Sequence, residues 1–411
     1  MASQIPAGRT PEVGPSPLTE TFDFTRLLRW PRQERGQAYD AADLLLLDTV
    51  AAWFAAGHTR EGLVVLDDRW GALTLPLLAR SMGPAEHAGA CRTAEEALAH
   101  TRSAQDGVVS EKALQANAMA LGLPSPVPET VDAALFEGAR TVLLPLPRSL
   151  ETLEDWAWLI AEHAAEAVVV LAGGRDKHMS RRMNEILQRH FQDVVPGRGR
   201  SKARVLTARG PRRGLPSPMP RSAEHQADLE APLRLFALGA AYGGTKLDPG
   251  TRLLLRTLEA QESFPGASRA VDLGCGNGSI AVWLARRHPG LRVLAADQSA
   301  SAVASARLSA EANGVLDRVE TLRDDALSSL PDSSEDLILL NPPFHQGNAV
   351  DVSVARRLIA DAGRVLGPGG RLYAVWNSHL KHRPHLERTV GPTDQLAKNA
   401  TFTVTVSSGR R

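Results

Sequence analysis

The chain has 411 residues, of which 43% are hydrophobic and 23% are charged, and its formal net charge is +1. A chain of this length and composition can bury more than one hydrophobic core, so we expect two domains. The near-neutral charge excludes a uniformly basic or acidic protein. It can still conceal a locally basic face, so partners have to be inferred from particular sites.

The amino-terminal residues and the cysteine content bear on the compartment. Residues 1–20 are rich in Pro, Gly and Ser and lack the apolar stretch of a signal peptide, and we expect residues 1–35 to form a flexible tail. The longest apolar runs, such as residues 167–173, are too short to span a membrane. Cys91 and Cys275 are the only cysteines, which is typical of a reducing compartment. These features predict a cytoplasmic protein.

Residues 36–208 follow the layout of the second half, as a degenerate copy would. The stretch GLVVLDDRWGALTLPLLAR, at 62–80, matches the pattern of RAVDLGCGNGSIAVWLARR, and residues 141–191 track the segment that begins at residue 336. The offset between the halves stays at about 200 residues, as a duplicated domain requires. The copy has a bulky acidic turn at 66–71 and Pro145 in place of Asn341. We therefore expect it to bind or position a partner, and not a small ligand at this turn.

Residues 209–228 combine Pro, Gly, Ser and Arg and predict an interdomain linker. Arginine and lysine are concentrated at residues 197–204 and 209–214. Two interpretations remain open for these basic residues: contacts to the phosphates of a nucleic acid, or a solvated linker.

Residues 229–411 alternate strand-like and helical patterns. Strands are expected at 269–274, 291–297, 318–326, 335–341 and 371–377, with helical patterns between most of them. This alternation predicts crossover connections and a mostly parallel sheet that is covered on both faces. Residues 395–408 predict a terminal antiparallel strand. The fold class is therefore α/β, with two tandem Rossmann-like domains.

A glycine loop, VDLGCGNG at residues 271–278, lies between a predicted strand and a predicted helix. Gly274, Gly276 and Gly278 can take positive φ and let a ligand approach the backbone near the start of the helix. A tight turn without a ligand would use the same residues, so that alternative stays open. Cys275 is interpreted as a small loop residue and not as a nucleophile.

Three aspartates accompany this loop. Asp272 leads the loop, and Asp297 closes the next strand 25 residues later, where a carboxylate can accept hydrogen bonds from both ribose hydroxyls of an adenosine. This spacing also suits NAD, but the loop is G-x-G-x-G where a dinucleotide fingerprint has G-x-G-x-x-G. Asp325 closes the third strand and could accept from an adenine amino group, or it could be an exposed carboxylate at a strand end.

These residues resemble the class I S-adenosylmethionine-dependent methyltransferases over most of residues 240–411. The resemblance implies seven-stranded sheets and S-adenosyl-L-methionine as the cofactor. The cofactor-binding residues that it implies are Asp272, Gly274, Cys275, Gly276, Gly278, Asp297, Asp325 and Asn341. The histidines and cysteines show no ligand spacing, so no metal is expected.

The fourth strand ends in Asn341, Pro342, Pro343 and Phe344, which we expect to form the catalytic turn. A proline cannot donate to a sheet ladder, so the chain must leave the sheet at Asn341. With a methyl donor at the first strand, the Asn341 side-chain oxygen and the Pro342 carbonyl could each accept an N–H of a conjugated amine, while Phe344 stacks on its ring. The motif predicts methylation of an amino nitrogen without choosing between nucleobases and glutamine amides.

The segment after this turn resembles the bacterial rRNA guanine-N2 methyltransferases. Their NPPF is followed by His and Gln, here His345 and Gln346, and their fifth strand ends in Asn-x-His-Leu, here residues 377–380. Residues 247–250 match a Leu-Asp-x-Gly segment of this family, although Gly243 and Gly244 stand where a phenylalanine is expected. His345 and Gln346 could line the base pocket or cap the next helix. Members of this family also carry a degenerate amino-terminal copy.

The resemblance implies methyl transfer to a guanine N2 amine of ribosomal RNA, with 23S favoured over 16S. The first domain would then recognise or position RNA, and the substrate would be free rRNA or a partly assembled subunit. We expect a monomer with no membrane or metal partner. The alternatives are a glutamine-N5 methyltransferase acting on a protein, a DNA amino methyltransferase, and a non-catalytic RNA-binding or ribosome assembly protein.

Overall fold

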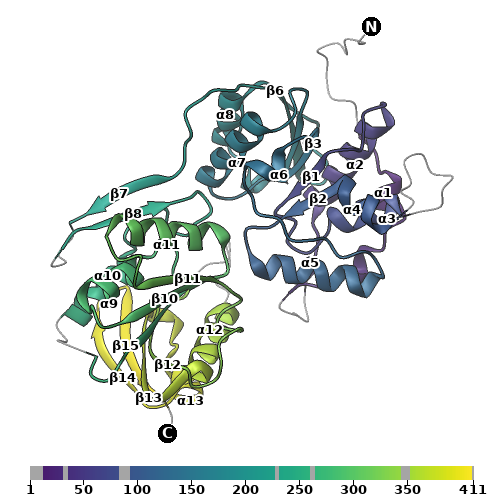
Figure 1. Ribbon diagram of the computed structural model, residues 1–411. Coiled ribbons are helices and arrows are strands. Elements are labelled where there is room, and N and C mark those ends of the chain that lie inside the picture. Colours follow the sequence, from purple (N-terminus) through teal and green to yellow (C-terminus); the bar gives the residue numbers. More distant parts are fainter. Residues whose placement is uncertain are drawn as a thin grey trace. The chain divides into compact units, whose positions relative to one another are not determined.

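A computed structural model describes residues 13–30, 36–82, 93–226, 231–259, 264–343 and 352–409 (Figure 1). The chain divides into two compact units, Met1–Pro218 and Met219–Arg411. None of the helices in the described part of the chain combines the length and the hydropathy that a membrane-spanning segment requires.

The helices of the first unit are α1 (Pro17–Glu20), α2 (Ala41–Ala55), α3 (Thr74–Ser81), α4 (Ala94–His100), α5 (Val108–Leu121), α6 (Ala133–Phe136), α7 (Leu150–His163) and α8 (Arg181–His190), with short 3-10 turns at Phe24–Arg26 and Asp176–His178. Its strands are β1 (Leu63–Leu66), β2 (Thr101–Ala104), β3 (Thr141–Pro145), β4 (Val169–Arg175), β5 (Phe191–Pro196) and β6 (Ala203–Pro211). They form one six-stranded sheet in the order β2-β1-β3-β4-β6-β5. The first four strands of this order run parallel, and β6 is antiparallel to both of its neighbours.

The helices of the second unit are α9 (Pro249–Glu259), α10 (Ser279–Arg287), α11 (Ala300–Ala312), α12 (Val352–Val365) and α13 (Arg383–Thr389), with a 3-10 turn at Ser378–Leu380. Its strands are β7 (Arg221–His225), β8 (Leu233–Ala237), β9 (Arg269–Leu273), β10 (Arg292–Asp297), β11 (Val319–Arg323), β12 (Glu335–Leu340), β13 (Leu366–Asn377), β14 (Thr393–Lys398) and β15 (Phe402–Ser408). Its main sheet has seven strands in the order β11-β10-β9-β12-β13-β15-β14.

The two sheets share one strand order, which confirms the predicted pair of mostly parallel Rossmann-like domains. The difference lies beyond β2, where the described residues contain no counterpart of β11 and only Ala104 forms a single parallel bridge with Glu129. Pro124, Pro126 and Pro128 precede this bridge. Because proline cannot donate to a ladder, the segment cannot continue as a strand there. The first sheet therefore has six described strands where the resemblance implied seven.

Part of the predicted amino-terminal tail belongs to the core of the first unit. Leu18, Phe24 and Leu27 are buried in the same hydrophobic cluster as α2. The backbone N–H of Ser16 donates to the buried carboxylate of Asp48 at 2.8 Å. Burial of these three apolar side chains outweighs the local Pro and Gly content that suggested a tail over residues 16–28.

The predicted linker at 209–228 also contains regular structure. β6 extends to Pro211, and β7 pairs with β8 as an antiparallel ribbon. The backbone N–H groups of Phe236 and Leu238 each donate at 2.9 Å to serines of α11, Ser309 and Ser305. The ribbon is thus fastened to the second unit. Of the described positions of the predicted linker, residues 212–220 and Gln226 lie outside strands.

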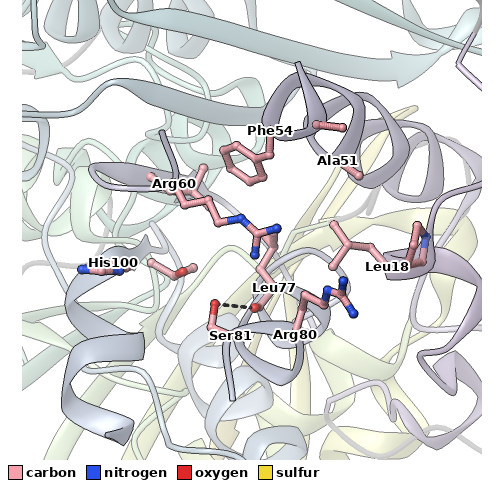
Figure 2. A pocket seen from close by; sticks show the side chains of 12 residues that line it. Leu18, Ala51, Phe54, Arg60, Leu77, Arg80, Ser81 and His100 are labelled. Carbon is pink, nitrogen blue, oxygen red and sulfur yellow. Dashed lines mark hydrogen bonds between the residues drawn. The ribbon is translucent and has the colours of Figure 1, made fainter. Parts of the chain in front are cut away.

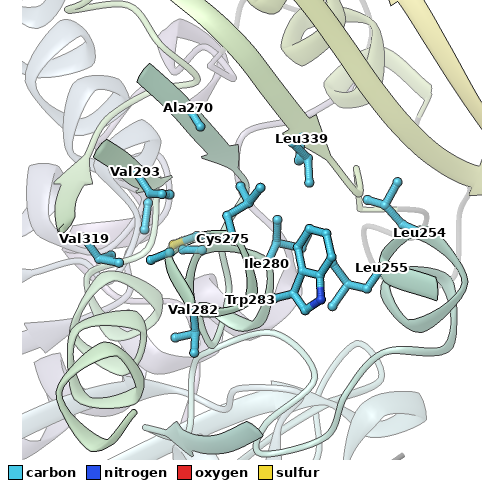
Figure 3. Packing of buried hydrophobic residues seen from close by; sticks show 14 of the residues in the cluster. Leu254, Leu255, Ala270, Cys275, Ile280, Val282, Trp283, Val293, Val319 and Leu339 are labelled. Carbon is cyan, nitrogen blue, oxygen red and sulfur yellow. The ribbon is translucent and has the colours of Figure 1, made fainter. Parts of the chain in front are cut away.

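Alternating residues of the central strands of the second sheet pack on opposite faces. Leu337 and Leu339 of β12 join a cluster with α9 and α10, whereas Ile338 and Leu340 join a cluster with α12. Figure 3 shows Trp283 of α10 among the side chains of the first cluster. A parallel sheet covered on both faces places its ligand site at the carboxyl ends of its strands.

Candidate active site

The glycine loop joins β9 to α10, and its three glycines have different surroundings. Gly274, Gly276 and Gly278 have φ of 75°, 52° and 76°, values that favour glycine. A Cβ built on Gly274 would meet no described atom within 4 Å, and one on Gly276 would meet only the Tyr242 carbonyl oxygen at 3.5 Å. These two positions keep an open space at the carboxyl end of β9.

Gly278 has a different role from the other two glycines. A Cβ at Gly278 would lie 2.7 Å from the Cα of Ala306 in α11, far inside normal contact. This glycine therefore allows α10 and α11 to pack closely. The sequence placed it among the cofactor-binding residues, whereas its surroundings are those of a packing residue.

Asp272 places a carboxylate behind the loop. Its Oδ2 accepts a hydrogen bond from the backbone N–H of Ala281 at 2.9 Å, but its buried Oδ1 has no hydrogen-bond partner among the described residues. Burial raises the pKa of Asp272 to about 7. Because a buried unpaired oxygen is costly, this atom suits a donor supplied by a ligand.

Asp297 connects the end of β10 to the glycine loop. Its Oδ2 accepts from the backbone N–H of Gly276 at 3.1 Å, and its Oδ1 accepts from the backbone N–H of Ser299 at 3.0 Å. The carboxylate is half-buried, and it stands at the same edge of the sheet as the loop. The geometry agrees with the predicted place of this residue beside the loop.

Asp325 follows β11 and is buried, with 9% of its surface exposed, so the alternative of an exposed strand-end carboxylate does not hold. Its Oδ1 forms an ion pair with Nη1 of Arg357 on α12. A carboxylate offers several lone pairs and can keep this arginine while accepting from an amino group. Arg357 could not be predicted from the sequence, because no local pattern relates α12 to the end of β11.

Asn341 leaves β12 with its amide in a defined orientation. Its Nδ2 donates to Asp248 Oδ2 and to Thr251 Oγ1, each at 2.9 Å. Its Oδ1 is buried and has no hydrogen-bond partner within the described part of the chain. The turn therefore holds an acceptor oxygen ready for a donor. Pro342 is buried and Pro343 is half-buried, whereas Phe344, His345 and Gln346 lie outside the described residues.

The Cys275 side chain points into the core and away from the open space. It is 5% exposed and packs in the cluster that contains Ile280 and Val293 (Figure 3). Burial, followed by the charges of Asp297 and Asp272, raises the pKa of this thiol, so the sulfur stays protonated. Only the backbone of Cys275 can line a ligand site here.

Asn277 is a site residue that the sequence analysis missed. Its Nδ2 donates to the backbone oxygens of Gly244 and Lys246, each at 2.9 Å, and so ties the segment before α9 to the glycine loop. Tyr242 lies in that segment with 60% of its surface exposed. It is the aromatic residue next to Gly243 and Gly244, where the resemblance called for a phenylalanine. The asparagine in the glycine loop was the feature of the sequence from which this contact could have been predicted.

Both units of this chain are similar to known proteins. Residues 16–212 match the family model for the RLMG N-terminal domain, and residues 232–406 match the model for the Methyltransferase small domain. Ribosomal RNA large subunit methyltransferase G of Shewanella amazonensis is 32% identical over 90% of this chain and 91% of its own length, and that of Streptomyces avermitilis is 33% identical over 94% and 98%. This chain belongs to the ribosomal RNA large subunit methyltransferase G family.

A solved relative of this methyltransferase G family member has the same fold. It is the T. thermophilus 16S rRNA N2 methyltransferase RsmC in complex with AdoMet and guanosine. Its chain is 24% identical with a TM-score of 0.70, and the match covers 90% of this chain and 92% of that one.

The turn after β1 in the first unit corresponds to the glycine loop after β9, and it is packed by side chains of its own unit. Asp68 is buried and its Oδ2 accepts from the backbone N–H groups of Leu73 at 3.0 Å and Thr74 at 2.7 Å, at the start of α3. A Cβ built on Gly71 would lie 2.6 Å from Cδ1 of Leu75. In this methyltransferase G family member these contacts make the turn after β1 compact, and the exclusion of a small ligand from it stays a prediction from its acidic sequence.

The first unit also contains a cavity of about 370 Å³. Arg60, Arg80 and Phe54 line it (Figure 2). Leu63 and Thr101, the first residues of β1 and β2, lie on its wall, so the cavity is at the amino ends of the parallel strands. It is not the counterpart of the space beside Gly274, which lies at the carboxyl ends.

Several of the basic residues near the predicted linker have structural partners. Arg200 forms an ion pair with the buried carboxylate of Asp48 and donates to the backbone oxygen of Val13 at 3.0 Å. The Arg209 guanidinium lies 5.1 Å from the ring centroid of Trp53. These two arginines stabilise the first unit, and neither of the two interpretations in the sequence analysis included that role.

Proposed function

We propose that this protein transfers the methyl group of S-adenosyl-L-methionine to the exocyclic N2 amine of a guanine in ribosomal RNA, with 23S rRNA favoured. The observation that carries the proposal is the unpaired, buried Oδ1 of Asn341. It stands at the carboxyl end of β12, the strand next to β9 and its open glycine loop. Membership in the methyltransferase G family, with relatives named for the large subunit, supports the choice of substrate.

The residues around the glycine loop fit the proposed cofactor. Gly274 and Gly276 would admit it against the backbone, since a Cβ at Gly274 would project into the open space. Asp272 Oδ1 would accept a hydrogen bond from it, Asp297 would bind the ribose, and Asp325 the adenine amino group. The cofactor supplies an electrophilic methyl group on a sulfonium.

Asn341 would hold the nucleophile. The lone pair of the guanine amine is delocalised into the ring, so the nitrogen is flat and weakly nucleophilic at neutral pH. Hydrogen bonds from this amine to Asn341 Oδ1 and the Pro342 carbonyl would favour a pyramidal nitrogen and an in-line approach. Both oxygens are oriented dipoles that stabilise the positive charge developing on nitrogen. No side-chain base is required, because the methylated product loses its proton readily. Phe344 is assigned to stacking on the base.

The substrate must present an accessible guanine. In a duplex the N2 amine is paired and faces the minor groove, so the target has to be unpaired or flipped out. We therefore assign free 23S rRNA or a partly assembled large subunit as substrate, with the first unit positioning the RNA. Ribosome assembly takes place in the cytoplasm, where we place the protein, acting as a monomer.

Methylation of rRNA from a strain that lacks this gene tests the proposal. Purified protein is incubated with tritium-labelled donor and separated 23S and 16S rRNA, and each RNA is digested to nucleosides. We expect label in N2-methylguanosine from 23S rRNA. Label in another nucleoside, or transfer only to protein or DNA offered in parallel, would contradict the proposed acceptor.

A further inference from the structure

Two residues far from Asn341 in the sequence fix the orientation of its amide. We infer that Asp248 and Thr251, at the start of α9, are positioning residues that keep the Asn341 oxygen, and not its nitrogen, facing the substrate amine. This inference rests on the proposed function. Asp248 and Thr251 precede Asn341 by 93 and 90 residues, and no motif of the turn itself contains them.

The hydrogen bonds of Asn341 permit one orientation. An amide nitrogen carries two donors, and both are used, one to Asp248 Oδ2 and one to Thr251 Oγ1, each at 2.9 Å. A flip of the amide by 180° would place Asn341 Oδ1 against the carboxylate of Asp248, which accepts only. The flip would therefore lose the hydrogen bond to Asp248 and oppose two partial negative charges.

The same flip would make the site unfit for an amine. It would present the Asn341 nitrogen, a donor, to an incoming NH₂ group, which also donates. In the observed orientation the buried Oδ1 has no hydrogen-bond partner in the part of the chain that the structure describes. The substrate amine would satisfy this oxygen, so the orientation selects for amino groups at the same time as it positions them.

Asp248 is itself held rigidly. Its Oδ2 also accepts from the backbone N–H groups of Gly250 at 2.8 Å and Thr251 at 3.0 Å, which caps the first turn of α9. Pro249 has no N–H that would need a partner at this position. The hydrogen bonds from Asn341 to Asp248 and Thr251 are called the clamp below. A Cβ on Gly250 would lie 3.0 Å from Asp248 Oδ2 and 3.2 Å from the ring of Phe402, so a larger residue would disturb the clamp. The segment from Asp248 to Thr251 thus acts as one unit.

Thr251→Val tests the hydroxyl, because valine keeps the shape of threonine and removes its acceptor. We expect kcat to fall about tenfold, the effect of one lost hydrogen bond. The dissociation constant of S-adenosyl-L-methionine should stay near the wild-type value, and the free energy of unfolding should fall only by the roughly 1 kcal/mol of one hydrogen bond. Thr251→Ser, which restores the hydroxyl, should recover turnover. Wild-type kcat in Thr251→Val, or an equal loss in both variants, would overturn the inference.

A second measurement separates this inference from the proposed function, because it does not use the reaction. The free energy of unfolding in urea is compared for Thr251→Val, Asn341→Ala and the double variant. We expect the double variant to lose less stability than the sum of the single losses, because the contact can be lost only once. If the stability losses of the single variants simply add, Thr251 and Asn341 do not interact, and the inference is overturned even if rRNA methylation is observed. Coupling together with an absence of rRNA methylation by the wild type would support the contact and refute the proposed function.

Asp248→Ala removes both the clamp and the cap of α9. We expect a larger loss of kcat, about a hundredfold, together with a lower melting temperature. Asp248→Asn keeps one acceptor oxygen for the helix and for Asn341, so its kcat should exceed that of Asp248→Ala at a similar cofactor affinity. Equal kcat in these two variants would contradict the positioning role.

Discussion

The turns after the first strand of each sheet show what a duplicated domain keeps and what it loses. The backbone N–H groups of Asp67 and Gly274 make the same hydrogen bond to the neighbouring strand, to Ala104 at 2.9 Å and Ala296 at 2.8 Å, so the two residues are equivalent. On that register Gly71 corresponds to Gly278. A Cβ at Gly278 would lie 2.7 Å from the backbone of α11, and one at Gly71 would lie 2.6 Å and 2.8 Å from the side chains of Leu75 and Leu114.

The two glycines that face the open space are not kept in the first unit. Gly274 and Gly276 face the open space in the second unit, whereas Asp67 and Arg69 occupy these positions in the first. Both copies thus keep a glycine at the position where a Cβ would be crowded. Room for a ligand is required only where a ligand binds. Pro145 in the place of Asn341 follows the same logic, because a proline cannot supply the side-chain oxygen.

The largest effect should come from the residue that only the second unit has. Asn341→Ala should lower kcat by roughly a hundredfold to a thousandfold, because it removes a preorganised acceptor beside the reacting nitrogen. Binding of S-adenosyl-L-methionine, measured by calorimetry, should change little. Pro145→Ala is the matched change in the first unit and should leave turnover unchanged. Equal activity of Asn341→Ala and the wild type would remove Asn341 from the mechanism.

The next comparison exchanges the acidic residue at the end of the second strand. Gln105 stands in the first unit where Asp297 stands in the second, since each follows an equivalent alanine, Ala104 and Ala296. Asp297→Gln should weaken S-adenosyl-L-methionine binding by about tenfold to a hundredfold, because it removes charge-assisted hydrogen bonds. Equilibrium dialysis measures this constant. An unchanged constant would show that the charge of Asp297 is not used for binding.

Adding a methyl group to the two kinds of glycine should separate binding from folding. Gly274→Ala should raise the cofactor dissociation constant about tenfold, because its Cβ enters the open space. Gly71→Ala should leave that constant unchanged and lower the free energy of unfolding by about 1–3 kcal/mol, because its Cβ meets Leu75 and Leu114. Calorimetry and urea unfolding test the pair. The comparison fails if Gly71→Ala weakens cofactor binding as much as Gly274→Ala does.

The smallest effect concerns Asp67, a half-buried acid in the turn after β1. Burial raises the pKa of Asp67 to about 6, so its contribution to stability is present below its usual pKa and is lost as the pH rises through 6. Asp67→Asn should therefore be more stable than the wild type at pH 8, by on the order of 1 kcal/mol, and the gain should shrink toward pH 4. Asparagine also accepts the φ of 46° at this position. A gain that is independent of pH would show that the charge is not its cause.

The sequence by itself determined the features that depend on neighbours along the chain. Alternation of strands and helices predicted the parallel sheets, the glycine spacing predicted the loop after β9, and the two prolines predicted the exit of the chain at Asn341. The acidic residues at 67 and 68 also predicted that the corresponding turn of the first unit excludes a small ligand. Each of these follows from the conformational limits of glycine and proline or from the period of a strand.

Only the tertiary structure decided which distant residues meet. Asp248 contacts Asn341, and Arg357 pairs with Asp325. The Cys275 side chain lies in the core, and Gly278 packs against α11. The tertiary structure also included residues 16–28 in the first core. These contacts join segments that only the folded sheet brings to one edge, and their energy comes from burial and directional hydrogen bonds that no local pattern of residues encodes.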